Sequence, residues 1–448
     1  MPHALALAVE MATTALAVAG MAYFLAALVA ARMFLHARRK ALAATAESGP
    51  AFAPGVSILK SLKGLDPGML DAFRSHCRQN YPGDFELLFG VSSLADPAAA
   101  AVEILRRDFP EIPIRLIECP LHLGANGKVS TLAQLAAHAR YDFLLINDSD
   151  ITVSPRYLER VMAAFAAEPE AGVRAELSPS ARVGQSGLVS GHDFSHAETA
   201  PETIGALAPT GDARAQPPVG LVTALYRGRA HGSIFRGGLA AHLEALGIAT
   251  DFMPAVLLSR LLEGGLHYGL GSTLAMRREA LEAAGGLLPL ADYLADDYQL
   301  GARVARAGYR VELCAEVVET GVPAYGWRGF ADHQLRWLRT VRDARPWGYA
   351  GLVFTHGLGW ALLNVIASGL SPLSLWLLAL SFFLRLSVAM TAGAEVLHDR
   401  QVLPHLWLLP LRDLVSMGLW AGGFAGHTIV WRGQRFLLHG GKLQKASS

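Results

Sequence analysis

The chain has 448 residues, of which 52% are hydrophobic and only 17% are charged. An ordinary soluble protein carries about a quarter charged residues, so this composition favours a chain with membrane-spanning segments. The 39 Lys and Arg residues nearly balance the 38 Asp and Glu residues, so the chain lacks the positive charge typical of nucleic-acid binding. Cys77, Cys119 and Cys314 are too few and too widely spaced for a disulfide framework or a zinc site, and we expect reduced core thiols.

The first long apolar segment is Met11–Ala31, which carries no charged side chain. It is long enough to cross a bilayer of about 30 Å as a helix. Positive charges follow it, at Arg32 and Arg38–Lys40, which predicts an uncleaved anchor with the rest of the chain in the cytoplasm. We therefore predict a membrane anchor over residues 1–40 and a linker of small residues and proline over residues 41–54.

Strand and helix patterns alternate from residue 55 to residue 345, which predicts a parallel α/β sheet in one cytoplasmic domain. The predicted strands are Val56–Leu59, Phe85–Val91, Ile114–Glu118, Phe143–Asn147, Gly220–Tyr226, Tyr309–Leu313 and Val317–Gly321. The predicted helices include Pro67–Gln79, Pro97–Asp108, Lys128–Ala139, Ser233–Leu246, Arg277–Ala284 and Phe330–Arg342. No GxGxxG sequence follows the first strand, so the fingerprint of a dinucleotide-binding fold is absent.

Residues 171–218 break this alternation and predict a mobile insertion, because they lack a sustained period. The insertion contains His192, Asp193, His196 and Glu198. We interpret these residues as part of a polar loop rather than a metal site, since no scaffold for a site is visible around them.

A second apolar region covers residues 346–432. Tyr349–Leu384 has no Asp, Glu, Lys or Arg and is interrupted by Ser371-Pro372, which predicts two crossings joined by a tight turn. Val402–Leu411 is too short to span and predicts an interfacial or re-entrant segment, whereas Leu414–Trp431 is long enough for a third crossing. Two crossings leave the basic tail, residues 433–448, in the cytoplasm, whereas three leave it outside; the number stays open.

The strand Phe143–Asn147 leads into a cluster of acidic residues, Asp148 and Asp150. In an extended chain, residues two apart project from the same face. Ligands of open α/β sheets bind at this end of the strands. Two carboxylates there suit Mg²⁺ or Mn²⁺, with further ligands from substrate phosphates. The simpler interpretation is an acidic turn after a strand.

Two further sites each have a structural and a functional interpretation. Asp96, before Pro97, suits either a helix cap or a contact with a nucleotide. The sequence Gly-Ala-Asn-Gly-Lys128 precedes a helix and suits either anion binding, with Lys128 as a point charge, or a glycine-rich turn with a solvated lysine. A full P-loop pattern is absent, so hydrolysis of ATP or GTP is not indicated.

The third group lies nearer the second apolar region. Asp296 and Asp297 are adjacent carboxylates; one of them either has a raised pKa and acts as a base, or both favour a helix N-terminus. His333, Arg336 and Trp337 share one helical face that suits a pyrophosphate and an acceptor cleft. The same basic and aromatic residues also suit anchoring at a membrane surface.

The complete set of motifs resembles the ceramide glucosyltransferase group of membrane-bound, inverting glycosyltransferases. The motifs are VSILKSLKGLDP (Val56–Pro67), ADP (Ala95–Pro97), GANGK (Gly124–Lys128), NDSD (Asn147–Asp150), ADDY (Ala295–Tyr298) and HQLRW (His333–Trp337). The resemblance is greatest to the bacterial branch that includes the hopanoid-biosynthesis glycosyltransferases. It covers residues 55–170 and 219–345, the anchor and the C-terminal apolar region.

The resemblance implies the nucleotide-diphospho-sugar transferase fold, Rossmann-like and of family A, with one N-terminal and two to three C-terminal transmembrane helices. It also implies roles for individual residues: Asp96 at the uridine of a UDP-sugar, Asp148 and Asp150 on a divalent cation, and Asp297 as the general base. Lys128, Arg336 and Trp337 would belong to the donor site. His333 departs from the family pattern, which starts this motif with Gln or Arg.

The predicted function is transfer of a hexose from a UDP-sugar to a hydroxyl group of a membrane lipid, at the bacterial inner membrane. The residues leave open whether the sugar is glucose or N-acetylglucosamine, and whether the lipid is a hopanoid polyol, a ceramide or a diacylglycerol. Two alternatives remain: a processive polysaccharide synthase and a non-catalytic lipid-binding protein derived from the same fold. A transporter is disfavoured, because an α/β pattern separates the apolar ends.

Overall fold

The computed structural model describes residues 2–48, 52–166, 217–431 and 434–445. Residues 171–216 of the predicted insertion lie outside these ranges, together with His192, Asp193, His196 and Glu198.

A seven-stranded sheet forms the centre of the domain, with strand order β3-β2-β1-β4-β6-β5-β7. The strands are β1 (Val56–Ser61), β2 (Phe85–Val91), β3 (Ile114–Glu118), β4 (Phe143–Ile146), β5 (Val219–Ala230), β6 (Leu274–Arg277) and β7 (Arg310–Val322). β6 runs antiparallel to both of its neighbours and the other strands pair in parallel, so the sheet is mixed. This architecture confirms the predicted α/β class.

The prediction of two short strands at the end of the domain is wrong, because β7 is one continuous strand. Its pairing with β5 changes register between Thr223 and Leu225, whose partners are Leu313 and Val317. The irregular register explains why the alternation in the sequence breaks there while the strand continues.

Helices cover both faces of the sheet, and alternate residues of each strand point into two separate cores. One core packs α2 (Met69–Cys77), α3 (Ala98–Asp108) and α5 (Tyr157–Ala166) against one face. The other packs α4 (Gly127–Ala136), α8 (Arg278–Ala283) and α9 (Asp296–Arg306) against the opposite face, together with α6 (Leu239–Gly247), α7 (Met253–Leu262) and α10 (Trp327–Ala344). In β1, Ile58 faces the first core and Leu59 faces the second.

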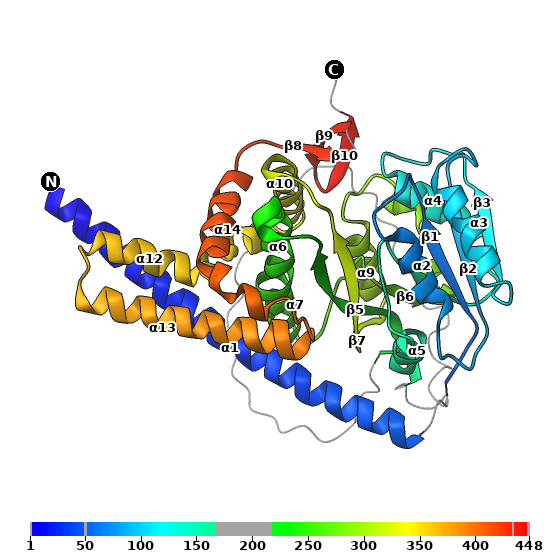
Figure 1. Ribbon diagram of the computed structural model, residues 1–448, viewed down its shortest axis with the longest axis horizontal. Helices are drawn as coiled ribbons and strands as arrows, with labels where there is room; N and C mark the ends of the chain where they lie inside the picture. The colour runs from blue at the N-terminus through cyan, green and yellow to red at the C-terminus, as the bar shows by residue number, and fades with distance from the viewer. Residues whose placement is uncertain (1, 49–51, 167–216, 432–433, 446–448) are drawn as a thin grey trace, which may run out of the picture.

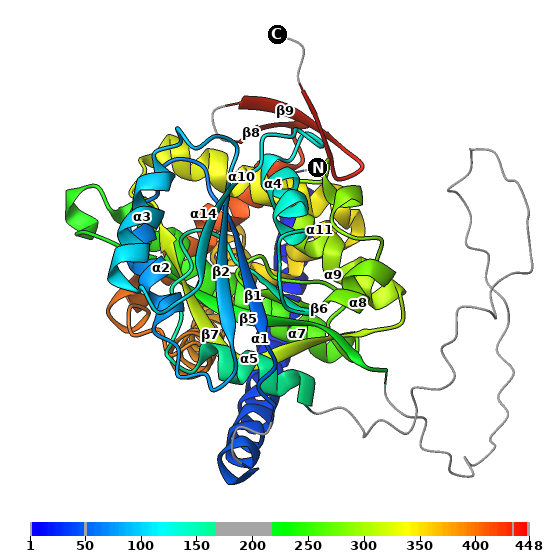
Figure 2. The ribbon, with the colours of Figure 1, turned by 90° about the vertical axis from the view of Figure 1, so that its right-hand side faces the viewer.

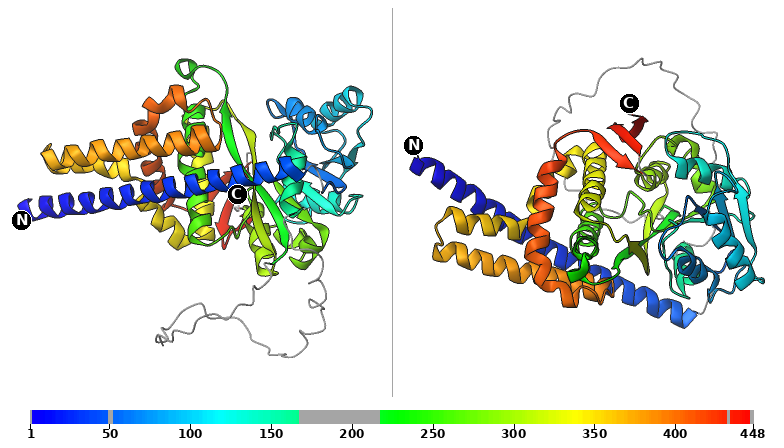
Figure 3. Two further views of the ribbon diagram at one scale, coloured as in Figure 1. Left: turned by 90° about the horizontal axis from the view of Figure 1, so that it is seen from below. Right: turned by 45° about the horizontal axis from the view of Figure 1, so that its top comes forward.

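Three helices project together from the domain, as Figure 1 and the left view of Figure 3 show: α1 (Pro2–Ser48), α12 (Gly357–Ala367) and α13 (Pro372–Val388). Within the described residues, three helical segments are long and apolar enough to cross a membrane, namely Ala4–Ala43, Leu239–Leu262 and Pro372–Val396. The bent pair Pro346–Thr355 and Gly357–Ala367, with an angle of 58°, is a fourth candidate. Leu239–Leu262 comprises α6, α7 and the π-helical turn between them, and more than half of its most apolar part is buried inside the protein.

Helix α1 is about 70 Å long at 1.5 Å per residue, so it extends well beyond a bilayer. Near its middle, Gly20 lies so close to Gly357 of α12 that a Cβ atom on Gly20 would be 2.2 Å from the Gly357 Cα atom. Small residues at such a crossing allow helices in lipid to approach closely. Further along, Ala30, Ala31 and Phe34 pack into the core of the α/β domain. The segment 41–54, predicted as a linker, is helical as far as Ser48.

The C-terminal region does not form the continuous helix over Leu414–Trp431 that a third crossing would need. The segment Leu403–Leu408 is a short 3₁₀ helix, α14 (Leu409–Gly423) follows it, and the chain then enters strand β8 (Thr428–Trp431). The physical reason lies in two charged residues of α14: Arg412 and Asp413 pair with Asp251 and Arg385, which fixes the helix to the π-helical turn before α7 and to α13.

The predicted basic tail is part of a three-stranded antiparallel sheet, formed by β8, β9 (Gln434–His439) and β10 (Lys442–Lys445). Ile429, Phe436, Leu438 and Leu443 form its small core. Figure 2 shows this sheet lying across the top of the α/β domain, beside the start of α4.

Candidate active site

The carboxylates of Asp148 and Asp297 face each other at one edge of the sheet. Asp148 follows β4, and Asp297 lies in the first turn of α9. Gly271 precedes β6 between them: a Cβ atom there would lie 3.0 Å from Asp297 Oδ2 and 3.5 Å from Asp148 Oδ2. Any larger residue at this position would enter the space that the two carboxylates share.

Lys128 joins the two acidic clusters. Its Nζ atom lies 2.7 Å from Asp148 Oδ1 and 3.3 Å from Asp296 Oδ2, and its side chain is only 16% exposed. These carboxylates raise the pKa of Lys128, so the side chain stays charged. The interpretation of Lys128 as a solvated lysine in a glycine-rich turn is therefore wrong.

The environment of Asp297 disfavours the ionised form of its carboxyl group. Burial and the neighbouring Asp296 raise the pKa of Asp297 to about 6, although Lys128 acts in the opposite direction. The backbone N–H of Tyr298 donates a hydrogen bond to Asp297 Oδ1 at 2.7 Å. A carboxylate with a pKa near the operating pH suits a general base, so the geometry favours this interpretation over a simple helix N-terminal acid.

Asp150 is held by β7. Its Oδ2 atom accepts hydrogen bonds from Thr320 Oγ1 at 2.6 Å and from the backbone N–H of Gly321 at 3.2 Å. Burial and Asp148 raise the pKa of Asp150, so negative charge accumulates here without full compensation.

Lys60, a fully buried lysine near the carboxyl end of β1, lies next to these acids. Its Nζ atom donates a hydrogen bond to the backbone oxygen of Asp148 at 3.0 Å. Burial lowers the pKa of Lys60 to about 7, while Asp150 and Asp148 favour its charged form. Through this hydrogen bond, Lys60 holds the carboxyl end of β4.

The loop before α9 fixes the distance between the acidic clusters. Asn126 caps α4 through Val129 N–H, and its side-chain nitrogen donates to the backbone oxygen of Tyr293 at 2.8 Å. Asp292 Oδ1 accepts from the Ala125 N–H at 2.9 Å, and its backbone oxygen accepts from the Leu443 N–H of β10 at 2.7 Å. The loop is therefore clamped between α4 and the C-terminal sheet.

The glycines of the GANGK sequence serve this packing. A Cβ atom on Gly124 would lie 2.5 Å from the backbone oxygen of Ala291, so glycine is required for the close approach of two chain segments. We predicted that both glycines would admit a ligand. Gly124 instead contacts the protein, whereas Gly127 has open space around its Cα atom.

Asp96 lies in the loop after β2 and caps α3. Its Oδ1 atom accepts hydrogen bonds from the N–H groups of Ala98 and Gly64, both at 2.9 Å. The loop that contains Gly64 also reaches the other acids, because Asp66 Oδ2 accepts from Ser149 Oγ at 2.8 Å. Asp96 is thus linked to the Asp148–Asp150 segment through this loop, and its contact with a nucleotide stays a prediction.

Arg336 and Trp337 come from α10. The Trp337 ring lies 5.2 Å from the His333 ring and 6.0 Å from that of Phe252, and the Phe252 ring lies 5.9 Å from that of Tyr226. Tyr226 lies on β5 two residues after Ala224, whose backbone oxygen accepts a hydrogen bond from Ser272 Oγ at 3.2 Å, next to Gly271 of the acidic site. Burial and the carboxylates of Asp297 and Asp148 raise the pKa of Tyr226 well above the ordinary value. The aromatic residues therefore lead from α10 toward the carboxylates, and the predicted roles of Arg336 and Trp337 at the donor stay predictions.

The donor set fits a hard divalent cation in part. No group of three or more His, Cys, Asp and Glu side chains that would hold a metal lies within the described ranges. Asp148 is 43% exposed and leaves Oδ2 beside Gly271, while Asp150 leaves Oδ1 next to its hydrogen-bonded Oδ2. Two carboxylates of this kind suit Mg²⁺ or Mn²⁺, which takes its remaining ligands from phosphates and water.

Sequence reasoning missed Lys60, Tyr226, Glu244, Gly271 and Thr320. Lys60 offered a signal, because it is a charged residue directly after Val56–Leu59, a strand that was expected to be buried. The other four offered none, because each matters through a contact with a distant segment.

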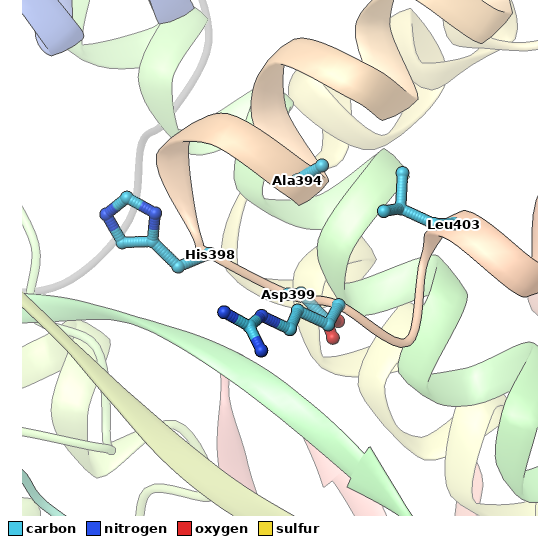
Figure 4. Close-up of a pocket in the computed structure, with 5 residues that line it drawn as sticks. Ala394, His398, Asp399 and Leu403 are labelled. Carbon is cyan, nitrogen blue, oxygen red and sulfur yellow. The ribbon is translucent and has the colours of Figure 1, made fainter.

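Figure 4 shows a pocket of about 260 Å³ elsewhere, lined by Ala394, His398, Asp399, Arg400 and Leu403. It lies at the loop after α13, and none of the predicted site residues lines it. It is therefore separate from the acidic site.

The mixed α/β sheet, the acids at its strand ends and the projecting apolar helices define a membrane-associated glycosyltransferase. A family model described as glycosyl transferase family 21 matches residues 13–190 and 201–444. The chain belongs to this family, which confirms the predicted ceramide glucosyltransferase-like class.

Curated relatives agree with this assignment. The ceramide glucosyltransferase of Komagataella phaffii is 36% identical over 115 residues, or 25% of this chain and 22% of that protein. Ceramide glucosyltransferase 3 of Caenorhabditis elegans is 23% identical over 64% of this chain and 50% of that protein. Ceramide glucosyltransferase 1 of the same organism is 21% identical over 88% of this chain and 74% of that protein. The matched region thus spans only about a fifth to a half of the first two relatives.

Solved structures give weaker similarity. A mannosyltransferase from Pyrobaculum calidifontis, in complex with GDP-Man and Mn²⁺, has a TM-score of 0.43 and 17% identity over 91% of this chain and 97% of that one. The S. aureus TarS fragment 1–349 with UDP has a TM-score of 0.36 and 12% identity over 86% of this chain and 96% of that one. Neither similarity carries an inference about ligands.

Proposed function

We propose that the protein transfers a hexose from a UDP-sugar to a hydroxyl group of a membrane lipid, with inversion at the anomeric carbon. The observation that carries this proposal is the pair Asp148 and Asp297, which face each other across Gly271 with Lys128 between the two acidic clusters. A hopanoid polyol or a ceramide-type lipid is the proposed acceptor, and the names of the relatives above support the ceramide-type lipid. The proposed location is the bacterial inner membrane, with the α/β domain in the cytoplasm.

Asp297 accepts the proton of the lipid hydroxyl group. The hydroxyl oxygen then forms a bond to the anomeric carbon on the face opposite UDP, while the bond from that carbon to the diphosphate oxygen breaks and its electron pair leaves with UDP. A single displacement of this kind inverts the configuration and forms no sugar–enzyme bond. The raised pKa of Asp297, about 6, supports its role as the base.

The chain's own charges face the departing diphosphate. Asp148 and Asp150 would hold a divalent cation, which supplies Lewis-acid stabilisation of the diphosphate when bound. Lys128 adds a fixed positive charge beside Asp148, and Arg336 is the second cationic candidate. Asp96 and Trp337 complete the proposed donor site. Asp96 contacts the uridine, and Trp337 lies where the donor site meets the acceptor.

The test is incubation of the full-length protein in detergent or liposomes with UDP-glucose and UDP-N-acetylglucosamine. Hopanoid polyol, ceramide and diacylglycerol serve as acceptors, and mass spectrometry identifies the products. We expect one added hexose per lipid, whereas a polymer would favour the polysaccharide synthase. Absence of both transfer and metal-dependent UDP-sugar binding would favour the non-catalytic alternative.

Asp297→Asn tests the proposed base. We expect kcat to fall at least 100-fold, because general bases contribute about 10²–10⁴. Asp142→Asn is the matched control, since Asp142 is 89% exposed at the opposite end of β4 and should tolerate the change. Wild-type turnover by a folded Asp297→Asn variant would refute the assignment of the base.

A further inference from the structure

A buried carboxylate lies behind His333, outside the acidic site. Glu244 of α6 is only 3% exposed, and its Oε1 atom lies 3.0 Å from His333 Nδ1. The hydroxyl group of Tyr325 donates a hydrogen bond to Glu244 Oε2 and lies 3.3 Å from the same His333 nitrogen. Two residues from separate segments, Glu244 and Tyr325, thus converge on one ring nitrogen of His333.

This arrangement fixes the tautomer of His333. A carboxylate only accepts hydrogen bonds, so the proton of the neutral imidazole belongs on Nδ1. The other ring nitrogen, Nε2, then carries the lone pair and accepts hydrogen bonds. The His333 side chain is 24% exposed, whereas Glu244 behind it is buried, so the ring is the part of this group that a ligand can reach.

The row of aromatic rings connects His333 with the acidic site. It consists of His333, Trp337, Phe252 and Tyr226, with successive ring centres 5.2, 6.0 and 5.9 Å apart. All four are partly exposed. Tyr226 lies at the acidic end of the row, because it follows Ala224 of β5 by two residues and the Ala224 backbone oxygen accepts a hydrogen bond from Ser272 Oγ at 3.2 Å, next to Gly271. A molecule lying along the row would meet Asp297 near one end and His333 at the other.

We propose that His333 Nε2 accepts a hydrogen bond from a second donor group of the lipid acceptor, a hydroxyl or an amide N–H, while the row of rings contacts the carbon skeleton beside it. This inference rests on the proposed function and narrows its acceptor. Ceramides and hopanoid polyols carry a second donor next to the glycosylated hydroxyl group. A 1,2-diacylglycerol carries one hydroxyl group and no second donor, and the site disfavours it.

Specificity of this kind has a physical basis in the lone pair of His333 Nε2, which receives no hydrogen bond from an acceptor that lacks a second donor. A site built to hydrogen-bond a substrate group discriminates strongly against an analogue that lacks the group, because its own polar atom is left unpaired. Glu244 and Tyr325 are positioning residues, since they act through the tautomer and orientation of the His333 ring. A purely structural Glu–His pair would affect all acceptors equally.

The experiment measures kinetics of the full-length protein with a short-chain ceramide, a hopanoid polyol and dioctanoylglycerol, each with the UDP-sugar that supports transfer. We expect the wild type to favour an acceptor with a second donor by at least 10-fold in kcat/KM. His333→Phe should raise the KM for that acceptor about 10-fold, leave the KM for the UDP-sugar unchanged, and remove the preference. Glu244→Gln should weaken the preference in the same direction.

Two controls separate the proposed contact from a folding defect. His333→Gln retains a hydrogen-bond acceptor at this position and should keep much of the preference, whereas Asp332→Asn changes an exposed neighbour on the same helix and should leave it intact. An unchanged preference in folded His333→Phe, or an equal loss with every acceptor, would overturn the inference.

A binding measurement distinguishes failure of the inference from failure of the proposed function. Titration of the same lipids, followed by tryptophan fluorescence, reports acceptor binding without transfer, because Trp337 contacts His333. If no lipid is glycosylated but ceramide still binds more tightly than dioctanoylglycerol in a His333-dependent manner, the proposed transfer fails and the inferred contact stands. Equal binding of the two lipids overturns the contact.

Discussion

At the scale of single residues, Asp297 predicts how the rate depends on pH. Its ionised form accepts the proton, and its pKa is raised to about 6 by burial and by Asp296. We therefore expect kcat to rise with pH through about 6, roughly tenfold per unit on the acid side, and to level off above it. Initial rates between pH 5 and pH 8 at saturating substrate measure this profile. A rate that is constant over the whole range would contradict it.

Lys60 predicts a separation of activity from stability. Lys60→Met removes a buried amine, whose pKa burial lowers to about 7, and retains a side chain of similar length. We expect the free energy of unfolding to change by no more than about 1 kcal/mol, because the cost of burying the amine disappears together with its hydrogen bond, and the two effects oppose each other. The hydrogen bond to the Asp148 backbone oxygen is lost, so activity should fall about tenfold and more divalent cation should be needed for half-maximal rate.

Thermal unfolding and cation titration of the same preparation provide the measurement for Lys60→Met. Lys63→Met is the matched control, since Lys63 is exposed three residues further along. An unchanged cation requirement in Lys60→Met would show that this lysine does not position the acids.

Single residues also show where sequence reasoning stops. The acids of the candidate site were found because each follows a recognisable strand or opens a helix, as Asp148 and Asp297 do. The contacts between elements were not found. Lys128 meets Asp148, and Glu244 meets His333, only through the packing of separate elements. Periodicity reports which face of its own element a residue occupies, and it carries no information about the residue opposite.

At the scale of elements, the C-terminal sheet is part of the support of the candidate site. β10 holds the loop that contains Asp292, and this loop holds the start of α4, where Lys128 lies. Phe436→Asp places a charge in the small core of the sheet and should detach it, with an activity loss of at least tenfold. Leu437→Asp changes the next residue of β9, which is 41% exposed, and should have little effect.

Transfer assays and the KM for the UDP-sugar test this prediction, together with limited proteolysis of the C-terminal segment. Full activity of Phe436→Asp with a cleaved tail would show that the clamp is dispensable. The sequence carried a signal for this sheet that we did not use: the alternating residues of Gln434–His439 and the pair Gly440-Gly441 are typical of a hairpin.

At the scale of the whole molecule, the docked C-terminal sheet favours two C-terminal crossings over three. β8–β10 contact the α/β domain, so the C-terminal region lies on the same side of the membrane as that domain. α12 and α13 then form the pair that crosses and returns, and their connecting turn lies at the far end of the projecting helices (Figure 1). The arginines of the second half of α1 predict, by the positive-inside rule, that the α/β domain lies in the cytoplasm.

Cysteine labelling tests this topology in intact cells. Leu370→Cys lies in the turn between α12 and α13 and is 69% exposed, so a membrane-impermeant maleimide should label it from outside. Leu437→Cys lies on the C-terminal sheet and should react only after lysis. The three native cysteines are buried and give a low background, which the unsubstituted protein measures. Labelling of Leu437→Cys in intact cells would place the C-terminal sheet outside and refute its contact with the candidate site, because the two contacting surfaces would then lie on opposite sides of the bilayer.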